Sequence, residues 1–160
     1  MNRSRLRIRL VLVLLVAFVL QAAYGSALAI HEARPNLSLT TLLIVCLFAD
    51  APTGALLGFL MGLLEAAYTE RYVGSFLVTR SLAGWAVGVL DETIFRDNLL
   101  VTLLTAPVGT LLVEGCFFLF APQPHVLRWA DRTLLQALYN GLLALPLYLV
   151  LRRIARRGQR

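Results

Sequence analysis

Three glycines recur at every fourth position of one apolar run, a pattern that few folds can accommodate. Gly54, Gly58 and Gly62 belong to GALLGFLMGLLE, residues 54–65. On a helix this spacing places all three on one face, where a second backbone can approach closely. The run ends on a carboxylate, Glu65, which still belongs to the apolar segment. A small-residue face beside an intramembrane acid is typical of the centre of a helical bundle in a bilayer.

The remainder of the chain is equally apolar. Of its 160 residues 59% are hydrophobic, and the mean hydropathy is +0.75. Soluble domains average about half apolar residues in an amphipathic pattern, whereas the apolar runs here are nearly continuous. The sequence therefore predicts an all-α integral membrane protein. Residues 1–160 are expected to form a single transmembrane domain, because no polar segment is long enough to fold separately.

Apolar runs and turn signals divide the chain into six expected helices. Their approximate limits are residues 8–30, 37–49, 53–70, 75–90, 99–120 and 133–151. The first run also resembles a secretory signal peptide, but every later segment is embedded too, so we expect an uncleaved helix. Residues 37–49 cover only about 20 Å, which leaves a thin span, a tilted helix supported by its neighbours, or a re-entrant piece. Residues 125–131 form either a short interfacial helix or a loop.

The basic residues are all arginine and gather at the two ends of the chain, giving a net charge of +6. Because these arginines flank apolar spans, we interpret them as orienting the protein in the membrane and expect no nucleic-acid partner. Arginine-rich flanks stay cytoplasmic, so both termini are expected there. An even number of spans is then required, which favours a six-transmembrane-helix bundle and disfavours a re-entrant second helix.

Ionisable side chains inside the expected spans are the strongest candidates for a site. Glu65, Arg80 and Glu114 should each lie about 8–9 Å below the outer surface, counted from the ends of their helices. Charges at that depth are costly and therefore candidates for function. Their shared depth predicts that Glu65 and Arg80 form an ion pair, with Glu114 nearby. Two interpretations stay open: a cluster that only fixes helix packing, or a binding surface for a lipid headgroup, a small ligand or a partner helix.

No pattern of an enzyme, cofactor or metal site is present, since the chain lacks a P-loop, a nucleophile elbow and paired Cys or His ligands. We predict no catalytic residue, no cofactor and no metal. Cys46 and Cys116 are expected at opposite depths and hence as unpaired, buried thiols. Gln21 is expected to bond a neighbouring helix, and Trp85 to pack in the core. Hydroxyls of the second helix should bond its own carbonyls, namely those of Ser38, Thr40 and Thr41.

A longer pattern joins several of these features. A Pro-Asn pair starts the second helix, glycines and an acid follow on the third, and a glycine turn leads to a polar fourth helix with a further glycine pair. The residues are Pro35, Asn36, Gly54, Gly58, Phe59, Gly62, Glu65, Gly74, Arg80, Gly84 and Gly88. This pattern resembles the rod shape-determining protein MreD family, as do the chain length, the six spans and the basic ends.

The resemblance implies a non-enzymatic scaffold in the bacterial inner membrane that is required for rod cell shape. Its implied partners are the bitopic protein MreC, cytoplasmic MreB filaments, the RodA and penicillin-binding-protein synthases of peptidoglycan, and membrane lipid. A scaffold needs grooves that face lipid and bind helices. The glycine faces would supply the helix-packing or partner-binding positions, which are Gly54, Gly58, Gly62, Gly84 and Gly88.

An alternative function follows from a second similarity, in hydropathy and fold, to the substrate-binding subunits of energy-coupling-factor vitamin transporters. Such a subunit needs an outward pocket with polar and aromatic walls. The predicted layer of Glu65, Arg80 and Glu114, with Tyr68 and Tyr72 nearby, is suited to that role. We favour the scaffold.

Overall fold

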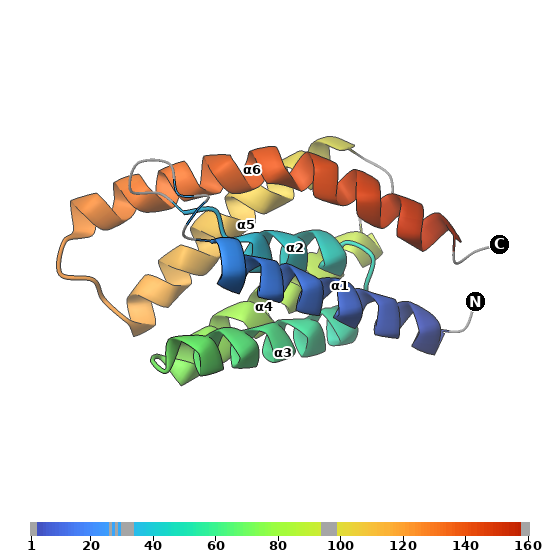
Figure 1. Cartoon of the computed structure of the whole chain (residues 1–160), viewed down its shortest axis with the longest axis horizontal. Coiled ribbons are helices and arrows are strands. Elements are labelled where there is room, and N and C mark those ends of the chain that lie inside the picture. The colour runs from blue at the N-terminus through green and yellow to red at the C-terminus, as the bar shows by residue number, and fades with distance from the viewer. Residues whose placement is uncertain (1–2, 26, 28, 30–33, 94–98, 158–160) are drawn as a thin grey trace.

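The computed structural model describes residues 3–25, 27, 29, 34–93 and 99–157. These residues form helices without strands (Figure 1). The helices are α1 (Arg3–Tyr24), α2 (Leu37–Cys46), α3 (Ala51–Thr69), α4 (Val73–Thr93), α5 (Leu99–Phe120) and α6 (Val126–Arg157). All except α2 are long and apolar enough to cross a membrane. The expected end of the first helix at residue 30 and the charged residues 94–98 lie outside the described residues.

The helices run back and forth along one axis, and Figure 1 shows both chain ends on the same side of the molecule. The end that carries the two termini is called the terminal end below, and the opposite one the distal end. The turns between α3 and α4 and between α5 and α6 lie at the distal end, and α1 ends and α2 begins on the same side of the molecule. The six helices thus alternate in direction along the chain, and α2 is much the shortest of them.

Helix α2 lies at the centre of the bundle, in contact with each of the other five helices. It has only 10 residues, about 15 Å of rise, and Ser38–Cys46 are all buried. A helix that is apolar on every face is stable only when it is covered on every face. The structure shows this segment as a short helix supported by its neighbours. It ends at Cys46, three residues earlier than expected.

The last helix differs most from its expected limits. Helix α6 begins at Val126 and ends at Arg157, a length of 32 residues, instead of spanning 133–151. Residues 126–131 are thus its first turns, neither a separate interfacial helix nor a loop. At its start, Pro124 precedes the helix, and no helix-breaking residue follows in the first turns. At its end, the arginines are good helix formers and lengthen the helix. Helix α1 is displaced toward the N-terminus, whereas α5 has the expected limits.

The hairpin of α3 and α4 makes the most extensive helix contact among the described helices. Gly54 and Gly84 face each other so tightly that a Cβ on either would collide with the carbonyl oxygen of the other. A Cβ at Gly62 would lie 2.6 Å from the Phe76 carbonyl oxygen, and one at Gly88 2.7 Å from the Ala51 Cα. The two backbones therefore touch along the whole hairpin, as small-residue faces allow.

The glycine faces of α3 and α4 were expected to serve helix packing or to form lipid-facing grooves for a partner. Each face is filled by the other helix, which agrees with helix packing and contradicts the lipid-facing grooves. Gly58, at the middle of the face, packs on the backbone of Arg80 and Ser81. These glycines lie in a contact within the chain, and any partner must therefore use another surface.

Candidate functional site: a buried ion cluster beside an open cavity

Helices α3, α4 and α5 bring Glu65, Arg80 and Glu114 together near the distal end. The Arg80 Nε donates to Glu65 Oε2 at 2.8 Å, and the Arg80 Nη2 lies 3.7 Å from Glu114 Oε1. The pair and the nearby second acid are arranged as their depths predicted. One guanidinium thus contacts two carboxylates. When both carboxylates are ionised, these three side chains carry a net charge of −1.

The cluster is sealed around its cation. The Arg80 side chain is 2% exposed, and the ring of Phe76 lies under its guanidinium, with 5.3 Å between the Cζ and the ring centroid. Phe117 of α5 packs on that ring at a centroid distance of 4.9 Å. A cation over an aromatic face gains electrostatic attraction that strengthens when water is excluded. This enclosure and the carboxylates allow Arg80 to remain charged inside an apolar bundle.

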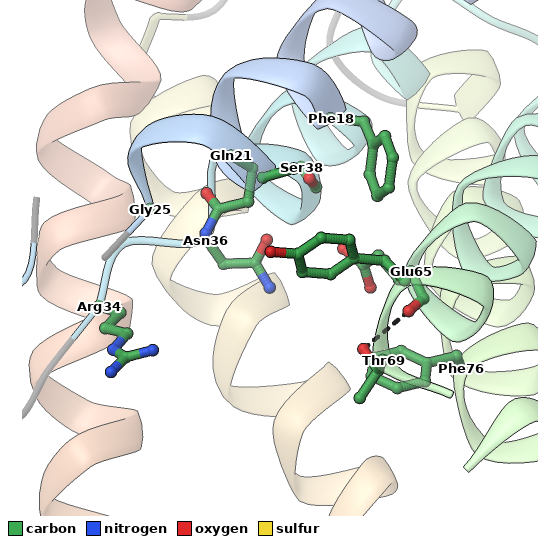
Figure 2. A pocket seen from close by; sticks show the side chains of 11 residues that line it. Phe18, Gln21, Gly25, Arg34, Asn36, Ser38, Glu65, Thr69 and Phe76 are labelled. Atoms are coloured by element: carbon green, nitrogen blue, oxygen red, sulfur yellow. Dashed lines mark hydrogen bonds between the residues drawn. The ribbon is translucent and has the colours of Figure 1, made fainter. Parts of the chain in front are cut away.

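An open cavity of about 250 Å³ adjoins the cluster on the side of Glu65. Residues from four helices and the α1–α2 connection line it. The polar ones are Gln21, Arg34, Asn36, Ser38, Glu65 and Thr69, and the aromatic ones Phe18, Tyr68 and Phe76. Figure 2 shows Gln21 and Ser38 on one side of this cavity, and Glu65 with Thr69 on the other. The sealed guanidinium itself does not line the cavity.

The start of α2 forms one wall of the cavity and is held by side chains of three segments. The Leu37 amide donates to Gln21 Oε1 of α1 at 2.7 Å, and the Leu39 amide donates to the capping Asn36 Oδ1 at 2.9 Å. The Asn36 amide donates to Asn140 Oδ1 of α6 at 3.0 Å. Free amides at a helix start are unsatisfied donors, so these acceptors stabilise a helix that begins inside the bundle.

Comparison with known proteins agrees with the resemblance seen in the sequence. The family model of rod shape-determining protein MreD matches residues 2–157. The chain belongs to the MreD family. Neither a curated protein nor a solved structure matches it significantly.

In this MreD-family chain, sequence reasoning missed the most buried polar residue of α6. Asn140 is fully buried, and besides accepting from Asn36 it donates from Nδ2 to Thr110 Oγ1 of α5 at 2.9 Å. A lone amide within an apolar span was the available signal, since polar groups in a membrane need partners. Gln21, recognised by that same reasoning, does bond a neighbouring helix, and that prediction is confirmed.

Other expectations for single side chains need correction in this MreD-family structure. Thr40 bonds its own helix start as predicted, at 2.8 Å from Asn36 O. The hydroxyls of Ser38 and Thr41 are instead buried without a hydrogen-bond partner in the part of the chain that the structure describes. Trp85 is 51% exposed, because it lies on a face of α4 away from the core. Both cysteines are free as predicted, yet Cys116 is exposed and only Cys46 is buried.

We expect Asn140→Leu to lower the free energy of unfolding of this MreD-family protein by about 1–3 kcal/mol, because it removes the acceptor of the half-buried Asn36 amide and the donor to the Thr110 hydroxyl. Thermal unfolding of the purified protein in detergent would measure the loss. Thr105→Val is the matched control, since that hydroxyl bonds Val101 O of its own helix and thus joins no second helix among the described residues. Equal stability of both variants would show that the network does not hold α2.

Proposed function

We propose that this chain is a non-enzymatic membrane scaffold of the machinery that gives bacteria a rod shape. The observation that carries the proposal is the match of the MreD family over nearly the entire chain. The family is defined by shape determination, and the structure supports a structural role through its tightly packed hairpin and sealed ion cluster. In this proposal the scaffold binds a bitopic MreC-like protein and links MreB filaments to the RodA and penicillin-binding-protein synthases.

The proposed setting is the bacterial inner membrane, with both termini in the cytoplasm. Support comes from the arginines, which flank the first and last helices, and from the position of the two chain ends on one side of the bundle (Figure 1). Arginine-rich flanks are retained on the cytoplasmic side. The cavity and the ion cluster then face the outer surface.

The proposed orientation predicts a labelling pattern. In a Cys116→Ser background, a cysteine at position 123 should react with an impermeant maleimide applied to whole cells, and a cysteine at position 3 should react only after lysis. The reason is that these positions lie at opposite ends of the bundle. Labelling of position 3 in intact cells would exclude cytoplasmic termini.

The scaffold function itself is tested in the native host. Depletion of this chain should convert rods into spheres, and affinity purification from native membrane should recover an MreC-like protein. Normal rods after depletion would overturn the proposal. A tagged, unrelated membrane protein of similar abundance provides the control for the purification.

The outward cavity favours one further candidate function, that of a substrate-binding transporter subunit. Its polar and aromatic walls meet the requirement for a small-molecule pocket. The same purification separates the two functions, because a transporter subunit would recover ATP-binding subunits and would not affect cell shape. The family match favours the scaffold.

A further inference from the structure

The start of α2 places one unused hydrogen-bond donor, the Ser38 hydroxyl, at the cavity. Ser38 lines the cavity and is 0% exposed, and its hydroxyl has no hydrogen-bond partner among the described residues. The amides on either side of it, those of Leu37 and Leu39, are already bonded to Gln21 and Asn36. A helix N-terminus carries a partial positive charge that attracts anions. Because Ser38 lines the cavity, its hydroxyl is placed to donate to an acceptor-rich occupant.

The wall of the cavity that contains Glu65 favours a cation, whereas the wall at the start of α2 favours an anion. Glu65 lines the cavity from α3, and the Arg80 guanidinium that it contacts is shared with Glu114. The Arg80 Nε occupies Glu65 Oε2, and the Glu65 carboxylate has the capacity to accept a further hydrogen bond from a cation at the cavity wall. At the other side, Arg34 lines the cavity with an exposed side chain and adds positive charge near the α2 start. The cavity is thus positive at one wall and negative at the other.

We propose that the cavity binds an aminoalkyl phosphate zwitterion, with the phosphate at the start of α2 beside Ser38 and Arg34, and the ammonium at Glu65. Phosphatidylethanolamine carries this chemistry as a headgroup, and free phosphoethanolamine carries it in solution. The volume of about 250 Å³ equals that of about eight water molecules in the liquid. This suits a headgroup better than a larger ligand.

The charge pattern discriminates against other headgroups. Phosphatidylglycerol brings a phosphate without a cation, and therefore offers Glu65 no ammonium in addition to its bond from Arg80. Phosphatidylcholine has a cation, but its methylated nitrogen cannot donate a hydrogen bond to a carboxylate. The binding of the zwitterion with a primary ammonium is therefore selective. This inference does not depend on the scaffold function.

Native mass spectrometry of the delipidated full-length protein tests the inference, with phosphatidylethanolamine, phosphatidylglycerol and phosphatidylcholine of matched acyl chains as probes. We expect phosphatidylethanolamine to bind about tenfold more tightly than the other two, the ratio that one hydrogen bond to a charged group supplies. Ser38→Ala should weaken its binding about tenfold. Thr41→Ala is the matched control, because that hydroxyl is also buried without a partner on α2 but does not line the cavity.

A second variant keeps the test independent of folding. Arg34→Gln alters an exposed side chain and should also weaken phosphatidylethanolamine binding while leaving thermal stability unchanged. Competition with soluble phosphoethanolamine identifies the source of the ligand: displacement of the lipid indicates that the free zwitterion is taken, and retention indicates that acyl chains are required. Equal binding of phosphatidylglycerol, or an equal effect of Ser38→Ala and Thr41→Ala, would overturn the proposal.

Discussion

Alanine at Gly58 is expected to destabilise the folded bundle by about 3 kcal/mol or more, at the upper end of what overpacking causes. A Cβ there would collide with the Arg80 carbonyl oxygen and lie 2.9 Å from the Ser81 Cα. Backbone atoms cannot rotate away as a side chain can, so α3 and α4 would have to separate. Thermal unfolding in detergent, together with the yield of monodisperse protein, would measure the effect.

The control for this substitution is Gly115→Ala on α5. A Cβ at Gly115 would meet no atom within 4 Å, so alanine should leave the packing intact. It should even raise stability by up to about 1 kcal/mol, because alanine favours a helix over glycine. Similar behaviour of the two variants would mean that the close contact of α3 with α4 is not a determinant of stability.

Arg80→Gln is expected to cost about 3–5 kcal/mol of folding free energy, since it leaves two carboxylates buried without their cation. Glu65→Gln should cost less, because Arg80 keeps Glu114 at 3.7 Å. The double variant should be more stable than Arg80→Gln alone, because it removes one of the two unpaired charges. These comparisons form a double-mutant cycle that isolates the pair.

Arg71→Gln controls for the general effect of removing a positive charge from this hairpin. Arg71 lies at the turn between α3 and α4 and is exposed, so its replacement should change stability by less than about 0.5 kcal/mol. If the losses at Glu65 and Arg80 simply add, the ion cluster would not be a coupled unit.

The hairpin and its ion pair were predictable because both follow from local geometry. A spacing of four residues determines which face of a helix carries only small residues. The rise per residue determines how far a charged residue lies from the end of its helix. The spacing of the glycines in Gly54–Gly62 and Gly84–Gly88 identifies the two helix faces that pack together. The rise per residue places the Glu65 carboxylate and the Arg80 guanidinium at the same depth. Neither rule needs knowledge of the other helices.

The position of α2 was not predictable by such rules. Its residues are apolar on every side, so periodicity does not indicate which helices surround it. The contact that anchors its start joins Asn36 to Asn140, which are 104 positions apart in the sequence. The cavity depends on that anchor, because Asn36 and Ser38 form its wall. A single sequence therefore shows the components of the candidate site without showing that they enclose a space.

The burial of α2 inside a shell of five helices has a consequence for the synthesis of this protein in the cell. A segment of about 15 Å is too short to cross the hydrocarbon core by itself, so its insertion depends on neighbours that leave the ribosome later. Asn140, which accepts from the start of α2, belongs to the last helix. Until that helix arrives, an unsatisfied backbone amide stays exposed within the membrane. Nascent chains that stop before α6 should therefore be recognised as incomplete and degraded by membrane proteases.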